Sequence, residues 1–230
     1  MFFYIDPVYF WYVLIPTLII SIGVQVYLKS TTAKWSQVPN GAHVTGAKAA
    51  QYIFAKTSLN PIPLERVPGN MTDHFDPGAN VVRLSQTTAD KTSVAAMAIA
   101  AHELGHVQQY QTGSGLIKMR GFLLPALQFS PTLSYISILF GFWFNLTGLI
   151  WVGIFFFALM VLFSLLTLPV EINASQRGLR LLDEAGLMVT EEDRKGARAV
   201  LTAAGLTYLA AAVTSILQLL YYISVAQRRS

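Results

Sequence analysis

The sequence predicts a mainly α-helical, multi-pass membrane protein with about four transmembrane helices and a small α+β region that carries a short β-hairpin. Only 12% of the 230 residues are charged and 53% are hydrophobic, whereas soluble domains carry roughly 25% charged residues. Uncharged stretches long enough to cross a bilayer alternate with polar segments. The longest polar segment contains short apolar runs separated by turn residues, which is typical of strands.

Residues 1–28 are expected to form an N-terminal transmembrane anchor. The 22 residues from Pro7 to Leu28 carry no charge, and such a helix spans about 33 Å, enough for a bilayer core of about 30 Å. Aromatic residues 9–12 mark its outer end and Lys29 closes the inner end. The N-terminus lacks the positive segment and the small-residue cleavage site of a secretory signal, so we expect the anchor to be retained.

Residues 29–120 form the long polar region, where water-exposed chemistry is expected. Thr45 is a candidate N-cap for a short helix that ends at Lys56, and Thr92 or Ser93 is a candidate cap for a helix that ends near Gln111. Between these helices the sequence predicts short strands and a β-hairpin, with strands at 64–67, 71–75 and 81–85 and a Pro-Gly turn at 76–80.

Residues 121–170 contain no charge at all. A single helix of this length would measure about 75 Å, more than twice the bilayer core, so we expect a transmembrane hairpin with its turn at 141–148. Pro125 and Pro131 are expected to kink or delay the first of its two helices.

The last two segments are a polar stretch and a final span. Residues 171–198 hold five basic and six acidic side chains, which predicts an amphipathic helical segment with 191–193 as a solvated helix start. Residues 199–230 are expected to form the C-terminal transmembrane helix, because Ala199 to Gln227 carries no charge.

The pattern His102-Glu103-x-x-His106 lies within the predicted helix that ends near Gln111. Two histidines four residues apart project from one helix face and can bind one Zn²⁺ per chain, while Glu103 can act as a base toward water. The sequence has no cysteine, so a metal must be held by histidine and carboxylate. A metal-free histidine pair is the alternative, but polar groups in a helix of small apolar residues cost free energy unless they are satisfied.

Glu171 is a candidate third ligand. A transmembrane hairpin returns the chain to the side on which it left, so Glu171 reaches the same membrane face as residues 29–120. A catalytic zinc site takes three protein ligands and keeps one position open. The alternative is an interfacial carboxylate that balances Arg177 or Arg180.

Two further features near the motif have open interpretations. His74 can donate to an oxyanion or cap the turn at Asp76. The hairpin can offer its edge to an extended peptide through Val82, Arg83 and Leu84, or it can pack without touching substrate.

The charge distribution predicts which side of the membrane the site faces. Of 16 Lys and Arg residues, nine lie in residues 29–120 and five in 171–198, whereas two lie at the C-terminus. By the positive-inside rule the active site is expected to face the cytoplasm of a bacterial cell, with the chain in the plasma membrane. The net charge of +4 thus reflects topology, and no nucleic-acid partner is expected.

The chain resembles the bacterial membrane-bound zinc metallopeptidases of the YugP type. The residues that carry the resemblance are 73–77, 82–85, 93–109 and 168–175. The resemblance implies a gluzincin-like zinc peptidase with His102 and His106 as zinc ligands, Glu103 as catalytic base and Glu171 as third ligand. Ser175 stands where gluzincins often carry an acidic residue that orients a zinc-bound histidine, so the candidates for this role or for substrate contact are Asn173, Ser175 and Arg177.

These observations together predict a membrane-embedded zinc endopeptidase that hydrolyses peptide bonds of membrane or membrane-proximal proteins. Its expected partners are membrane lipids and a protein or peptide substrate, with other membrane proteins or a second copy of the chain as further candidates. The alternative is a membrane scaffold or assembly factor with a structural zinc, for which His43 is a remote fourth ligand. A metal transporter is disfavoured because the predicted spans contain no charged residue and no histidine.

Overall fold

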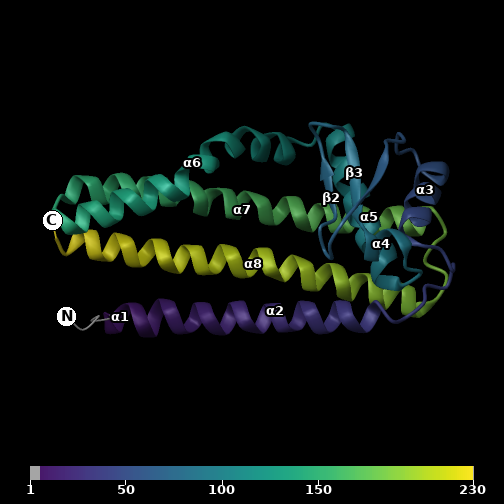
Figure 1. Cartoon of the computed structure of the whole chain (residues 1–230), viewed down its shortest axis with the longest axis horizontal. Helices are drawn as coiled ribbons and strands as arrows, with labels where there is room; N and C mark the ends of the chain where they lie inside the picture. Colours follow the sequence, from purple (N-terminus) through teal and green to yellow (C-terminus); the bar gives the residue numbers. More distant parts are fainter. Residues whose placement is uncertain (1–5, 230) are drawn as a thin grey trace. The chain divides into compact units, whose positions relative to one another are not determined.

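The structure is a computed structural model that describes residues 6–229, and it is mainly helical with one small sheet, as the sequence predicted (Figure 1). The helices are α1 (Pro7–Tyr9), a π-helical turn η1 (Phe10–Leu14), α2 (Ile15–Trp35), α3 (Gly46–Lys56), α4 (Gln86–Asp90), α5 (Val94–Gln111), α6 (Gly115–Trp143), α7 (Thr147–Glu184) and α8 (Glu191–Gln227). The strands are β1 (Leu64–Val67), β2 (His74–Asp76) and β3 (Val81–Ser85).

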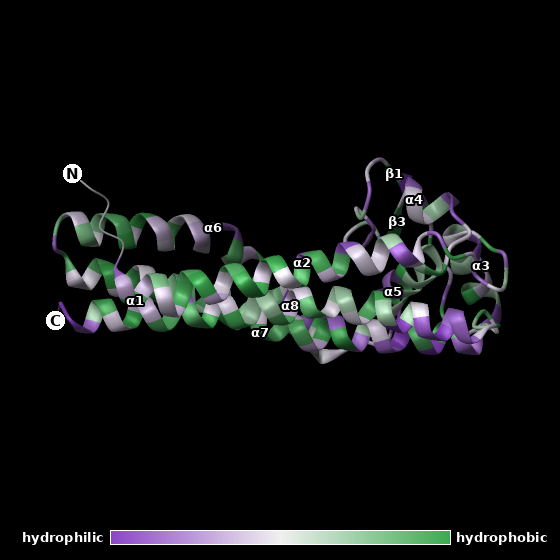
Figure 2. Cartoon of the chain, turned by 90° about the horizontal axis from the view of Figure 1, so that it is seen from below, coloured by the Kyte–Doolittle hydropathy of each residue, from purple (hydrophilic) through white to green (hydrophobic). Residues whose placement is uncertain are grey.

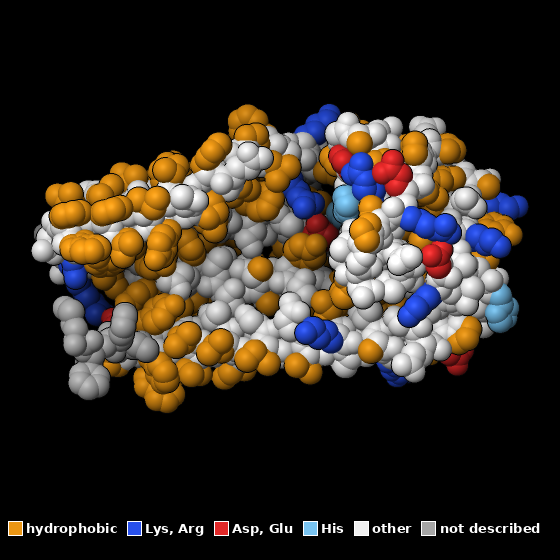
Figure 3. Space-filling view, viewed as in Figure 1, with side chains coloured by type: hydrophobic (Ala, Val, Ile, Leu, Met, Phe, Trp, Pro, Cys, Tyr) orange, Lys and Arg blue, Asp and Glu red, His pale blue; other side chains and the backbone are white. Residues whose placement is uncertain are grey.

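Three helical stretches are long and apolar enough to cross a membrane, namely Pro7–Trp35, Thr147–Glu184 and Glu191–Gln227. A fourth is present if the two parts of α6, which bend by 51° next to Pro125, count as one span. Proline lacks the amide hydrogen and its ring displaces the preceding turn, which explains a bend at this position. Figure 2 shows hydrophobic residues along these helices, and Figure 3 shows charged side chains gathered over the sheet and its helices.

The chain divides into two compact units. One consists of the residues up to Val24, Lys118–Pro169 and the residues from Thr207 onward, and the other consists of Gln25–Ile117 and Val170–Leu206. α2 and α7 continue beyond the apolar stretches that predicted them, to Trp35 and Glu184. Backbone hydrogen bonds do not depend on hydropathy, so a helix can extend past the residues suited to lipid.

Residues 171–198 form the end of α7 and the start of α8, which agrees with the predicted helical segment and with a helix start at 191–193. α7 ends at Glu184, and Gly186 follows with φ of 69° while the amide of Leu187 donates to the carbonyl of Leu182. A left-handed residue with this bond pattern is a usual helix terminator, and glycine adopts it without a side-chain clash.

The predicted solvated start of α8 is wrong for one of its three acidic residues. Glu191 and Glu192 are exposed, but Asp193 is 0% exposed. Its carboxylate accepts hydrogen bonds from the amides of Thr190 and Gly41, and the Thr190 hydroxyl accepts from the amide of Asp193. This reciprocal cap satisfies backbone donors that the first turn of a helix leaves unpaired, and it also fixes the loop at Gly41.

The sheet has the strand order β1-β3-β2. β2 and β3 form the predicted antiparallel hairpin, whereas β1 pairs in parallel with β3, with Leu64 opposite Val82. β3 is therefore the central strand, and its residues Val81, Val82 and Leu84 are buried in the core of this unit. The sheet places the hairpin against α5, which is buried along most of its length.

Candidate metal centre

α5 presents the two histidines and the glutamate of the motif. The helix begins after Ser93, whose hydroxyl accepts from the amide of Ala96 at 3.2 Å and so caps the first turn, as predicted. Its first half consists of small apolar residues, and 13 of its 18 residues are buried. The helix is thus held rigidly, and His102 and His106 lie one turn apart on the same face.

Contact between the backbones of α5 and α7 brings Glu171 to these histidines. A side-chain carbon at Gly105 would collide with the carbonyl oxygen of Ala174, and one at Gly178 would lie 2.7 Å from the carbonyl oxygen of Ala101. The two helices can approach so closely only because both positions are glycine. Glu171 is then 2% exposed and faces the histidine pair.

Three ligand atoms converge at this point. The Oε2 atom of Glu171 lies 3.3 Å from Nε2 of His102 and 3.3 Å from Nε2 of His106, and the three residues form a group able to hold a metal ion. Zinc bonds of 2.0–2.2 Å in a tetrahedral site place neighbouring ligand atoms about 3.3–3.6 Å apart. The donor set and its spacing therefore fit Zn²⁺.

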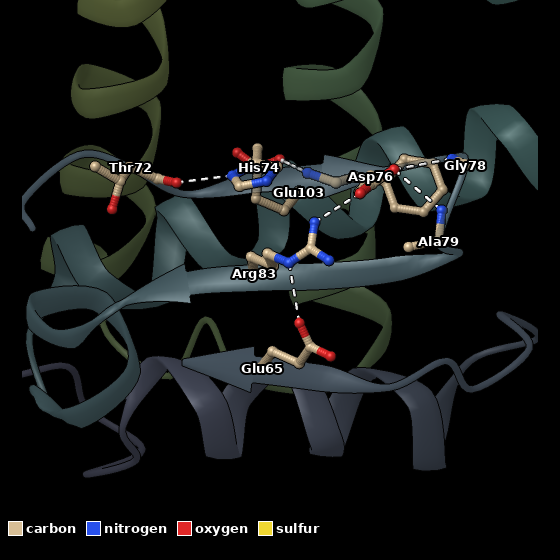
Figure 4. Close-up of polar contacts among 9 residues, drawn as sticks. Glu65, Thr72, His74, Asp76, Gly78, Ala79, Arg83 and Glu103 are labelled. Carbon is tan, nitrogen blue, oxygen red and sulfur yellow. Dashed lines mark hydrogen bonds and ion pairs between the residues drawn. The ribbon is translucent and has the colours of Figure 1, made fainter. Parts of the chain in front are cut away.

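Glu103 lies beside this group and is held by the sheet. Its Oε2 atom accepts a hydrogen bond of 2.9 Å from the amide of Phe75 in β2 (Figure 4). The residue is 7% exposed, and this burial raises the pKa of the Glu103 carboxyl, although His102 and His106 nearby oppose the rise. A carboxylate with a raised pKa is better suited to accept and return a proton near neutral pH.

Each histidine has a partner at its second ring nitrogen. Nδ1 of His102 lies 3.1 Å from the hydroxyl oxygen of Ser175, and Nδ1 of His106 lies 3.1 Å from Oε1 of Gln109. Such contacts leave Nε2 of each ring free to face the Glu171 carboxylate.

Asn173 and Arg177 do not contact either histidine directly. Oδ1 of Asn173 accepts from Nε2 of Gln109 at 2.9 Å and from Nε of Arg177 at 2.8 Å, and Arg177 also donates to Oε1 of Gln108. The sequence interpretation missed Gln108 and Gln109, which carry these contacts. Their position three or fewer residues after His106 was the only available signal, and no common motif assigns a role to a glutamine there.

The structure places Val82, Arg83 and Leu84 away from the expected substrate side. They lie in the central strand, both of whose edges are paired, and the side chains of Val82 and Leu84 are buried. Arg83 bridges Glu65 at 2.9 Å and Asp76 at 2.6 Å across the sheet (Figure 4). The edge beside Glu103 belongs to β2 instead, because the amide of Phe75 points there.

His74 does not cap the turn at Asp76. Its Nδ1 atom lies 2.8 Å from the carbonyl oxygen of Thr72, whereas the Asp76 carboxylate accepts from the amides of Gly78 and Ala79 and from Arg83 (Figure 4). A carbonyl oxygen can only accept, so Nδ1 carries the hydrogen and Nε2 of the neutral ring is an acceptor. In this arrangement a neutral His74 cannot donate to an oxyanion.

Two histidines one turn apart, a buried distal glutamate and a second glutamate beside them are the constituents of His₂Glu zinc hydrolase sites. The comparisons with known proteins agree with this class. Residues 10–227 match the family described as "Putative neutral zinc metallopeptidase", and the chain belongs to this family. It is 36% identical to the "Putative membrane protease YugP" of Bacillus subtilis (strain 168) over 216 residues, which cover 94% of this chain and 96% of the relative. No solved structure matches the chain.

Proposed function

We propose that this protein is a membrane-embedded zinc-dependent endopeptidase that hydrolyses peptide bonds of membrane or membrane-proximal proteins. The observation that carries the proposal is the convergence of His102, His106 and Glu171 on one point, with Glu103 held beside it by the amide of Phe75. The apolar helices support a location in the membrane, and the family supports peptide hydrolysis. The relative's description as a membrane protease agrees with both.

In the proposed reaction His102, His106 and Glu171 would hold one Zn²⁺, which would supply a Lewis acid for the scissile carbonyl and for the attacking water. Glu103 accepts the proton of the attacking water and later donates it to the leaving amine. The Phe75 amide binds one oxygen of the Glu103 carboxylate, which leaves the other oxygen for this proton transfer. In this proposal the backbone of an extended substrate pairs with β2, which is an edge strand of the sheet.

A structural zinc site is the rival interpretation, and the described residues do not favour it. The metal-binding group within residues 6–229 has three members, whereas structural zinc sites usually have four protein ligands. His43 is exposed and is not a member of this group. A three-ligand site leaves a position for water, which is the arrangement of a catalytic centre.

Replacement of the base tests the proposal. We expect Glu103→Gln to retain zinc, because the ligands are unchanged, and to lose cleavage of an unstructured test protein such as casein by about 10²–10⁴-fold. The measurement combines elemental analysis with cleavage assays on the full chain in detergent micelles. Glu184→Gln, the same change at an exposed site on α7, is the matched control. Undiminished cleavage by Glu103→Gln would overturn the assignment.

A further inference from the structure

Gln109 is a buried polar side chain at the site, and both ends of its amide group have hydrogen-bond partners. It is 0% exposed, and its amide group makes three contacts. Oε1 lies 3.1 Å from Nδ1 of His106, and Nε2 donates to the carbonyl oxygen of Val170 at 2.8 Å and to Oδ1 of Asn173 at 2.9 Å. One side chain of α5 thus connects a candidate zinc ligand to the residue that precedes Glu171 on α7.

The chemistry of the partners fixes the orientation of this amide. The Val170 carbonyl can only accept, so the NH₂ group of Gln109 must face α7 and its oxygen must face His106. The guanidinium of Arg177 can only donate, and it donates to Oδ1 of Asn173. The same Oδ1 atom accepts the hydrogen bond from Nε2 of Gln109, so Asn173 cannot present its own NH₂ group to Gln109. Both partners on α7 therefore require the same orientation of Gln109.

The orientation of Gln109 then determines the tautomer of His106. An amide oxygen can only accept, so the contact with Gln109 requires a hydrogen on Nδ1 of His106. A ring that carries its hydrogen on Nδ1 offers the lone pair of Nε2 as a ligand to a Zn²⁺ held together with Glu171. The partner of His102 imposes no such requirement. The Ser175 hydroxyl can donate or accept, so either tautomer of His102 is compatible with that contact.

We propose that Gln109 is a positioning residue that holds His106 in the metal-binding tautomer and ties it to the Glu171 segment of α7. The proposal rests on the zinc site of the proposed function. It does not require Gln109 to touch substrate or metal. The side chain acts through His106 and through the register of α7 against α5.

The hydrogen bond between His106 and Gln109 provides the first test. In the zinc-loaded full chain, prepared with ¹⁵N-labelled histidine, we expect the Nδ1–H of His106 to exchange slowly with water because Gln109 Oε1 accepts its hydrogen bond. We expect this exchange to become faster in Gln109→Met. Equally fast exchange in the two proteins would overturn the proposal, whatever their cleavage activity.

Replacement of Gln109 provides the second test. We expect Gln109→Met, which keeps the length but loses all three contacts, to weaken zinc binding by about 10–100-fold in chelator competition. Gln111→Met is the matched control, because Gln111 also makes two amide hydrogen bonds on α5, but with the loop residue Asn60. Wild-type zinc affinity in Gln109→Met would overturn the proposal.

Gln109→Glu separates the two roles of the side chain. A carboxylate can still accept from His106, but it cannot donate to Val170 or Asn173. We expect the Nδ1–H of His106 to remain hydrogen-bonded and slow to exchange in the zinc-loaded variant, while zinc affinity falls as in Gln109→Met. Zinc binding as tight as in the wild type would disprove the tie to α7. Failure of Glu103→Gln to lose activity would instead contradict the proposed function while leaving the hydrogen-exchange result for His106 unaffected.

Discussion

Gly105 shows how a single residue inside the motif controls the position of a ligand outside it. The two residues between Glu103 and His106 have no chemical role in the H-E-x-x-H pattern. At position 105, however, any side chain would meet the carbonyl oxygen of Ala174, which belongs to the backbone of α7 and cannot rotate away. Glycine is therefore required by the helix that carries Glu171.

We expect Gly105→Ala to lower both thermal stability and zinc affinity. Alanine would favour the helix by up to about 1 kcal/mol, but forced separation of packed helices costs about 1–3 kcal/mol. The net effect is destabilising, and zinc titration with thermal unfolding in micelles measures it. Gly205→Ala is the control, since a side-chain carbon there has open space around it. Equal stability of Gly105→Ala and wild type would show that α7 does not constrain this position.

The residues of the site differ in how far the sequence predicts them. His102, Glu103 and His106 follow from local spacing on one helix. Ser175 was a candidate partner for a histidine because it lies four residues after Glu171, and it does lie beside His102. Gln109 could not be predicted, since its role depends on which face of α7 packs against α5.

At the scale of elements, the start of α8 depends on one buried carboxylate. Asp193 receives hydrogen bonds from the amides of Gly41 and Thr190. Its negative charge also lies in the first turn, where the helix dipole favours it. A change at this position affects the helix and the loop at the same time.

Asp193→Ala should lower the free energy of unfolding by about 1–3 kcal/mol, because buried amide groups lose their acceptor. Glu192→Ala should change it by less than about 0.5 kcal/mol, because Glu192 is exposed at the neighbouring position. Denaturant unfolding in micelles compares the two variants. A similar loss of unfolding free energy in Asp193→Ala and Glu192→Ala would mean that the negative charge of the first helical turn stabilises α8, and that the hydrogen bonds of Asp193 do not.

Elements governed by local chemistry were predictable and those governed by remote pairing were not. The caps at Thr45 and Ser93 and the hairpin of β2 and β3 follow from short-range patterns. Each residue of the parallel strand β1 lies 18 positions from its partner in β3, and nothing in the residues of β1 selects a parallel register. The lengths of α2 and α7 exceeded the prediction because hydropathy marks the lipid-facing part of a helix and not its ends.

At the scale of the whole molecule, the expected number of spans led to the third candidate ligand. A hairpin of two spans between residues 120 and 171 would return the chain to the membrane side on which it left, and on this expectation Glu171 was predictable as a partner of a motif 65 positions upstream. From the positive residues near the ends of the predicted spans we expect the site to face the cytoplasm.

Single introduced cysteines test this orientation without interference, because the chain has none of its own. We expect Asn70→Cys and Glu184→Cys, at exposed positions of the site-bearing unit, to react with an impermeant thiol reagent only after the membrane is opened. Phe144→Cys, in the turn between α6 and α7, should react in intact cells. The reverse pattern would place the site on the outside.

The most direct test of the metal centre is the zinc content of Glu171→Gln beside that of the wild type, Glu103→Gln and the exposed-site control Glu184→Gln. We expect about one zinc per chain in all but Glu171→Gln, whose neutral amide is a poor replacement for a carboxylate ligand. Elemental analysis of the purified full chains, after dialysis against a weak chelator, measures it. Full zinc retention by Glu171→Gln would contradict the claim that α7 completes the metal centre.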